Sequence, residues 1–154
     1  MAAGDLDAAR RHLAEALDIA GALDDRSGLA NQTFNLGLAE YLSGSPGRAG
    51  DFFAESLEAA RRVRMPAGTA YALIGLALAG DGAGPGRAAR LHGAADHALA
   101  VLGETVEPLE AGLRDLGRER LRAAMGADAF EAEYAAGQAM NAEEILALAL
   151  GDRT

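Results

Sequence analysis

Hydrophobic residues recur at intervals of three and four along most of the chain, which is the spacing of one face of an α-helix. Between residues 28 and 42 the apolar positions are Ala30, Phe34, Leu38, Tyr41 and Leu42, and residues 67–79 behave similarly. Each stretch is followed by a glycine-containing turn, at residues 43–46 and 80–86. Glycine readily ends a helix, and proline suits the first helical turn because the N–H groups there have no helical partner. The pattern predicts helix, turn and helix, repeated along the chain.

The helical pattern itself repeats along the sequence. Residues 4–20 align with residues 44–60, with identities at Gly4/Gly44, Ala9/Ala49, Ala14/Ala54, Glu15/Glu55, Leu17/Leu57 and Ala20/Ala60. A third copy begins at residue 85, where Pro-Gly-Arg-Ala at 85–88 repeats residues 46–49. Gly37 and Gly75 lie inside the intervening helices, where each costs about 1 kcal/mol relative to alanine. We expect two helices to approach closely at these glycines.

Residues 30–63 resemble a tetratricopeptide repeat. Leu36 and Gly37 fall at its Leu-Gly positions, Tyr41 lies near its aromatic position, and Ala49 and Phe53 match its second-helix Ala and Phe. Thr33 and Val63 stand where the family has Trp and Pro.

The copies are spaced further apart than in the standard tetratricopeptide repeat. This longer spacing is similar to that of the repeats in large regulators of high-GC bacteria, the LuxR-type ATPase regulators and antibiotic regulatory proteins. Residues 87–95, 125–130 and 142–149 resemble the C-terminal end of those regulators. In such proteins the ATPase and DNA-binding parts lie elsewhere in the chain.

The repeat and the resemblance together predict an all-α fold, a right-handed α-solenoid of tetratricopeptide-like helix pairs with a C-terminal helical cap. We expect the repeats to occupy residues 1–103, as a half repeat (1–24) and two repeats (25–64 and 65–103). The cap would occupy residues 104–154. A repeat array needs such a terminal unit because its last helix must present an outer face to water.

The last third shows its own helical signals. One apolar stripe is formed by Leu113, Leu116, Gly117, Leu121 and Ala124, and Phe130 with Tyr134 forms an i,i+4 pair. Two pairs have the spacing of a capping box, Asp128 with Glu131 and Asn141 with Glu144. We therefore expect helices to begin near both pairs, which gives a cap of three helices.

Composition supports the helical prediction and excludes several functions. Of 154 residues, 38 are Ala and 22 are Leu, the best helix formers. The net charge of −9, with 14 Arg and no Lys, repels phosphate backbones and anionic lipids. We expect no direct nucleic-acid binding by this segment and no membrane association, because no apolar run approaches the roughly 20 residues of a span. Without Cys or a signal core, we expect a cytoplasmic location.

Candidate chemistry is sparse. His92 and His97 are poorly spaced for one metal-binding helical face, and His12 is remote in sequence. The glycine-rich turn at 80–87 has no Lys and does not follow a strand, so it is not a phosphate-binding loop. The carboxylates Asp51, Glu55 and Glu58 form a solvated ridge, and the arginines at 61, 62 and 64 suit a helix end. We expect no enzyme activity, no catalytic residues, no metal and no cofactor.

What remains is a surface for binding. In the register of the resemblance, the concave face would present Asn31, Phe34, Asn35, Leu38 and Tyr41, with Asn35 where family members grip a ligand backbone. Thr69 and Leu73 stand where some members place cations that clamp a C-terminal carboxylate, so we expect no binding of an acidic tail. An alternative is that Phe34 and Leu38 simply pack against a neighbouring helix or a missing repeat.

The expected function is that of a non-catalytic protein–protein interaction module, the sensing or docking C-terminal part of a bacterial transcriptional regulator. Three alternatives remain open: a small-ligand-binding helical sensor domain, a standalone adaptor and a cryptic hydrolase. Because residues 1–24 form half a repeat, an apolar stripe of Leu6, Ala9, Leu13, Ala16 and Leu17 would be exposed. We expect this end either to adjoin upstream domains of a longer polypeptide or to form a homodimer through the N-terminal helix.

Overall fold

The computed structural model describes residues 3–80 and 84–151, and these residues form eight α-helices with no strand among them. The all-α prediction is confirmed. No helix in these two ranges has the combination of length and apolar character that crossing a bilayer requires. The helices are α1 (Ala3–Ala22), α2 (Arg26–Leu42), α3 (Pro46–Arg62), α4 (Pro66–Gly80), α5 (Pro85–Leu102), α6 (Pro108–Met125), α7 (Ala127–Gln138) and α8 (Ala142–Leu150).

The first three turns share one backbone conformation at evenly spaced positions. Asp24, Gly44 and Arg64 each adopt a left-handed conformation, with φ of 52°, 84° and 54°. The next residue in each turn donates its N–H to a carbonyl of the preceding helix, at 2.8–2.9 Å, in the pairs Asp25 to Ala20, Ser45 to Glu40 and Met65 to Ala60. This is the Schellman arrangement, which closes a helix and reverses the chain. The sequence repeat therefore consists of two equivalent helix–turn units.

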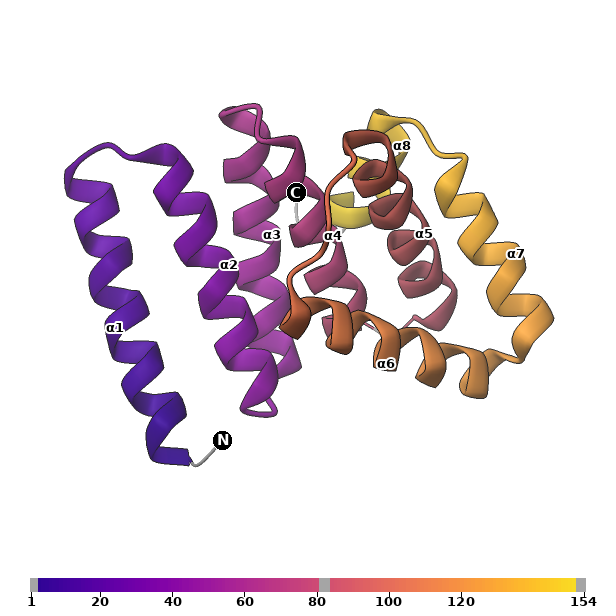
Figure 1. The fold of residues 1–154 in the computed structure, drawn as a ribbon, viewed down its shortest axis with the longest axis horizontal. Helices are drawn as coiled ribbons and strands as arrows, with labels where there is room; N and C mark the ends of the chain where they lie inside the picture. Colours follow the sequence, from indigo (N-terminus) through magenta and orange to yellow (C-terminus); the bar gives the residue numbers. More distant parts are fainter. Residues whose placement is uncertain (1–2, 81–83, 152–154) are drawn as a thin grey trace.

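Helices α1 to α5 pack consecutively, each against the next, as a row that runs from left to right in Figure 1. In addition, α2 contacts α4 and α4 contacts α6, so the first helices of successive pairs are neighbours. This is the packing of an α-solenoid, in which stacked helix pairs share one continuous core.

Phe53 of α3 forms the centre of this core. A Cβ added at Gly37 of α2 would lie 2.6 Å from the Phe53 ring, and one added at Gly75 of α4 would lie 2.4 Å from it. The ring is fully buried and fills the space that the two glycines leave. The close approach expected at these glycines is confirmed, but it is an approach to an aromatic side chain rather than to a helix backbone.

The cap departs from the repeat, because α7 rather than α6 makes the main contact with α5. Helix α6 runs below α4 and α5 in Figure 1 and leads to the lower end of α7. The backbones of α5 and α7 touch at two glycines: a Cβ on Gly93 would lie 2.0 Å from the Tyr134 carbonyl oxygen, and one on Gly137 would lie 1.9 Å from that of Arg90. Glycine at both positions is what allows α7 to occupy this place.

One of the two predicted capping boxes is present. Asn141 accepts from the Glu144 N–H at 2.9 Å, and Glu144 accepts from the Asn141 N–H at 2.8 Å, at the start of α8. The box predicted for Asp128 and Glu131 is wrong. Helix α7 begins after Gly126 with no side-chain cap, and Glu131 instead pairs with Arg122 of α6 at 2.8 Å. Spacing alone did not distinguish a cap from an interhelical ion pair.

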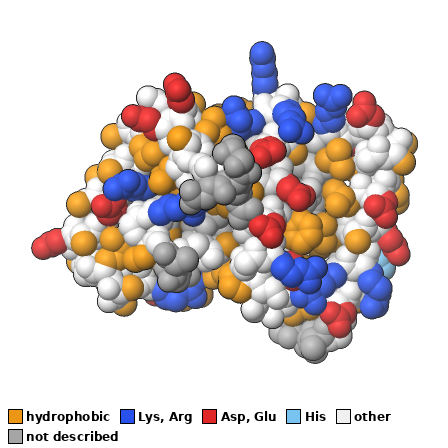
Figure 2. Space-filling view, turned by 180° about the vertical axis from the view of Figure 1, so that it is seen from behind, with side chains coloured by type: hydrophobic (Ala, Val, Ile, Leu, Met, Phe, Trp, Pro, Cys, Tyr) orange, Lys and Arg blue, Asp and Glu red, His pale blue; other side chains and the backbone are white. Residues whose placement is uncertain are grey.

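The apolar stripes predicted in the first helix and in the last third of the chain, which lie in α1 and α6, are only partly buried. In α6, Gly117 and Leu121 are buried and Leu113 is half-buried, but Leu116 and Ala124 are exposed. The stripe of α1 is half-buried, and the large exposed side chains near its end are Ile19 and Leu23. On the face seen in Figure 2, acidic and basic side chains are interspersed with hydrophobic ones.

Candidate docking groove

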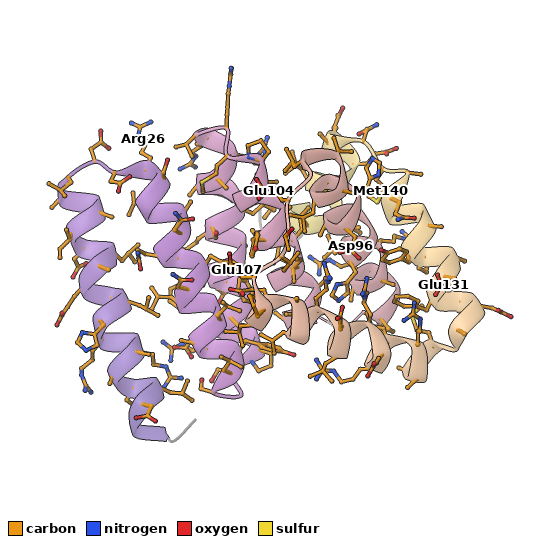
Figure 3. The ribbon with its side chains drawn as sticks, in the orientation of Figure 1. Arg26, Asp96, Glu104, Glu107, Glu131 and Met140 are labelled. Carbon is orange, nitrogen blue, oxygen red and sulfur yellow. The ribbon has the colours of Figure 1, made fainter. Side chains whose placement is uncertain are left out.

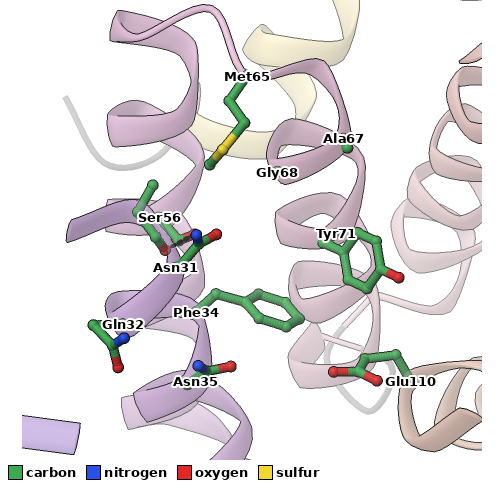
Figure 4. Close-up of a pocket in the computed structure, with 11 residues that line it drawn as sticks. Asn31, Gln32, Phe34, Asn35, Ser56, Met65, Ala67, Gly68, Tyr71 and Glu110 are labelled. Atoms are coloured by element: carbon green, nitrogen blue, oxygen red, sulfur yellow. Dashed lines mark hydrogen bonds between the residues drawn. The ribbon is translucent and has the colours of Figure 1, made fainter. Parts of the chain in front are cut away.

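A groove of about 480 Å³ lies between α2 and α4, and the start of α6 reaches its lower end (Figure 4). We call it the docking groove and define it by its lining residues, which come from α2, α3, the turn before α4, α4 and α6. They are Ala30, Asn31, Gln32, Phe34, Asn35, Ser56, Met65, Ala67, Gly68, Tyr71 and Glu110. The volume lies within the range typical of ligand-binding clefts.

The α2 wall of the groove carries two amide side chains. Asn31 and Asn35 are one helical turn apart on α2, so they lie on the same face of the helix. Neither amide forms a hydrogen bond with any other residue within 3–80 and 84–151. The helix is held in place by Asp25, which accepts from the Gly28 N–H at 2.9 Å, and by Ser56 of α3, which donates to the Ala30 carbonyl at 2.9 Å. These two bonds cap the start of α2 and tie the helix to α3, and its two groove-lining amides are available to a ligand.

Aromatic rings form the floor. Phe34 packs against Phe53 with ring centroids 5.4 Å apart and meets Tyr71 of α4 edge-on at 5.7 Å. Phe34 is 8% exposed, so it belongs to the core and touches the groove with one edge, whereas Tyr71 is half-buried. A ligand would contact the Tyr71 ring more extensively than that of Phe34.

The far wall depends on the turn that precedes α6. The Tyr71 hydroxyl accepts from the backbone N–H of Glu107 at 2.9 Å, which joins the start of α6 to α4. Three residues later, Glu110 places its carboxylate at the groove, below the rings of Phe34 and Tyr71 (Figure 4). The hydrogen bond leaves the Tyr71 O–H proton available to donate.

The structure brings three of the five predicted concave-face residues together. Asn31, Phe34 and Asn35 line the docking groove. Leu38 does not line it, because this side chain is 7% exposed and belongs to the hydrophobic core, as the packing alternative expected. Tyr41 also lies outside the groove, and its hydroxyl accepts from Arg120 of α6 at 2.6 Å. From Leu38 onward, core and cap cover this face of α2.

Two further lining residues, Tyr71 and Glu110, were not predicted from the sequence. Tyr71 lies at the repeat-equivalent face of α4, and the helical pattern of residues 67–79 could have indicated it. Glu110 had no such signal, because it lies far from Asn35 in the sequence, in a helix that departs from the repeat. Only the direction in which α6 crosses the array brings its carboxylate to the groove.

A second polar cluster lies where α5, α6 and α7 meet, around Asp96 (Figure 3). The Asp96 carboxylate accepts from Arg114 at 3.3 Å, from Arg118 at 2.7 Å and from the Tyr134 hydroxyl at 2.6 Å. Its side chain is 12% exposed. Burial, followed by the hydrogen bond to Asp96, raises the pKa of Tyr134 to about 12. With three donors on it, this carboxylate is poorly suited to act as a general base, and it joins the cap to the repeats.

His92 precedes Asp96 by one turn of α5 and is fully buried. Neither ring nitrogen has a hydrogen-bond partner within the described part of the chain. Burial lowers its pKa to about 4, opposed by the charge of Asp96 and assisted by those of Arg118, Arg114 and Arg120. The ring is neutral at pH 7 and sealed from solvent. His97, in contrast, is exposed, as is His12, which lies 4.0 Å from Glu15.

The described residues include no group of three or more His, Cys, Asp or Glu side chains that could hold a metal ion. No protein-family model, curated protein or solved structure matches the chain. Because no similar protein suggests a function, we compare the two polar sites in the structure, the docking groove and the Asp96 cluster. Of the two, the groove is open to a ligand and has polar groups with no partner within the described ranges, whereas the carboxylate of the Asp96 cluster is already bonded to three donors.

Proposed function

We propose that this chain is a non-catalytic helical-repeat module that docks an extended peptide segment of a partner protein in the docking groove. The observation that carries the proposal is a pair of amides, Asn31 and Asn35, which lie on one wall of the docking groove and have no hydrogen-bond partner among the described residues. Each amide offers both a donor and an acceptor, which is what a peptide backbone requires.

The spacing of the two amides suits an extended chain. Side chains one helical turn apart have Cβ atoms about 6 Å apart. Residues i and i+2 of an extended peptide are roughly 6.7 Å apart and present their backbone groups on the same side. Asn31 and Asn35 can therefore bond alternate peptide units while a side chain between them lies on the floor at Phe34 and Tyr71.

The composition of the groove favours a peptide over a small apolar ligand. A small-ligand sensor would have a closed, apolar pocket, whereas this groove combines amides and a carboxylate with aromatic and aliphatic side chains. The resemblance of residues 87–95 and 142–149 to the end of bacterial regulators supports a place in a transcriptional regulator. There, peptide docking would alter the coupling to an effector domain.

The proposal is tested by screening the whole chain against an array of blocked random decapeptides. We expect a subset to bind, and we expect an Asn31→Ala/Asn35→Ala variant to lose at least tenfold in affinity for that subset. Gln138→Ala, which removes an exposed amide on α7, is the matched control and should bind as the wild type does. An array on which no peptide binds, or binding that the double variant leaves intact, would contradict peptide docking in this groove.

A further inference from the structure

The docking groove carries a single charge. Among its lining residues Glu110 is the one acidic side chain, and no lining residue is cationic. Glu110 is half-buried in the first turn of α6 and has no ion-pair or hydrogen-bond partner among residues 3–80 and 84–151. Arg114, one turn further along α6, is engaged by Asp96 instead. The groove therefore presents a negative charge that no residue in the described part of the chain neutralises.

The neighbours of Glu110 suit a long cationic side chain. The half-buried ring of Tyr71 stands beside the carboxylate, and Phe34 and Met65 extend the apolar floor (Figure 4). Arginine and lysine pack their aliphatic stems on such surfaces while the charged head reaches a polar partner. A guanidinium or ammonium group over an aromatic face gains a cation–π attraction, and a carboxylate acceptor strengthens its hydrogen bonds.

We infer that the docking groove selects peptides carrying an arginine or lysine, whose cationic head binds the Glu110 carboxylate and whose stem lies on Tyr71. The backbone on either side is held by Asn31 and Asn35, so this inference rests on the proposed peptide-docking function. The net charge of −9 favours the approach of such a partner from a distance. The groove then adds a local contact that long-range attraction alone does not supply.

The experiment uses the same array of blocked random decapeptides and the whole chain. Arginine and lysine should be enriched among the peptides that bind, relative to the array as a whole. For the tightest-binding peptide, fluorescence anisotropy then compares wild type, Glu110→Gln and Glu119→Gln. Glu119 is exposed and nine positions beyond Glu110 on α6, which places it on the opposite side of the helix. Both variants change the net charge equally, so their difference isolates the contact in the groove.

We expect Glu110→Gln to weaken binding about tenfold and Glu119→Gln to leave it within twofold of wild type. Replacing the critical arginine or lysine of the peptide by glutamine should cause the same tenfold loss in wild type and no further loss in Glu110→Gln. This peptide-side change keeps the protein intact, so it also gives the answer if the Glu110 variant folds poorly.

The outcomes separate the two proposals. Peptides that depend on Asn31 and Asn35 but show no cationic preference, or that bind Glu110→Gln as tightly as wild type, would overturn the assignment of Glu110 and leave peptide docking standing. Equal losses in Glu110→Gln and Glu119→Gln would overturn it too, because they would show attraction by net charge alone. The absence of any binding peptide would overturn peptide docking itself and the inference with it.

Discussion

Arg10 of α1 holds the carboxylate of Glu40 of α2 with two hydrogen bonds, Nε to Oε1 and Nη2 to Oε2, each 3.1 Å long. The Glu40 side chain is 3% exposed, whereas that of Arg10 is 29% exposed. Arg48 of α3 lies 3.5 Å from the same carboxylate. A buried carboxylate is tolerable only when it is paired, so this contact decides how the first helix attaches to the stack.

Arg10→Met should loosen α1 from the rest of the protein. The substitution keeps much of the side-chain volume but leaves the Glu40 carboxylate with Arg48 as its remaining cationic partner. We expect faster amide hydrogen exchange in α1 and little change in α4 and α5. Adding Glu40→Leu should restore much of the protection of the α1 amides from exchange, because the buried carboxylate that lost its Arg10 partner is then removed. If the double variant exchanges as fast as Arg10→Met, the carboxylate is not the cause.

The left-handed turns predict two substitutions of opposite sign. Arg64→Gly should stabilise the protein by about 0.5 kcal/mol, because relief of roughly 1–2 kcal/mol of backbone strain exceeds the roughly 0.5–1 kcal/mol that glycine costs through the unfolded chain. Gly44→Ala should destabilise it by a similar amount for the converse reason. Urea denaturation measures both changes. The same sign in both variants would show that turn conformation does not control them.

Gly93→Ala and Gly137→Ala should each cost about 3 kcal/mol of unfolding free energy, because the added methyl group would overlap a backbone carbonyl oxygen, which cannot move aside as a side chain can. Gly112→Ala is the control, since that position in α6 is open and alanine should stabilise the helix by about 1 kcal/mol. Urea denaturation of the three variants decides the point. A stable Gly137→Ala protein would mean that α7 does not lie this close to α5.

His92 predicts a loss of stability in mild acid. Burial lowers the pKa of His92 to about 4, compared with about 6.5 in the unfolded chain. Between these two pH values the imidazole is protonated in the unfolded state but neutral in the folded state, so acid favours unfolding. The contribution of the neutral ring is complete above pH 6.5 and is lost as the pH falls toward 4. Between pH 7 and pH 5 the wild type should lose about 2 kcal/mol more than a His92→Leu variant, which has no imidazole to titrate.

Urea denaturation at both pH values provides the His92 comparison. The other titratable groups are the same in both proteins, so their contributions to the pH dependence cancel in the difference. Parallel losses in wild type and His92→Leu would contradict a buried neutral histidine.

Much of the α1 to α5 region could be predicted from the sequence because its signals are local. The prolines at 46 and 85 begin helices, the glycine at 44 ends one, and the apolar spacing indicates the packing faces. The candidate site was predicted in part, since Asn31, Phe34 and Asn35 share one helical face. Leu38 and Tyr41 share that face too, but the hydrophobic core encloses Leu38 and Arg120 of α6 bonds to Tyr41. The spacing of apolar residues within one helix does not indicate where a helix distant in sequence will pack.

The helices, their turns and the repeat that they form follow from local signals in the sequence, because propensity, capping and backbone conformation act over a few residues. Tertiary packing decided the rest. It placed α7 beside α5 and oriented α6 so that Glu110 reaches the docking groove. It also buried His92 one helical turn from Asp96. These contacts join residues far apart in the chain, and they depend on the volumes and charges that meet when helices pack.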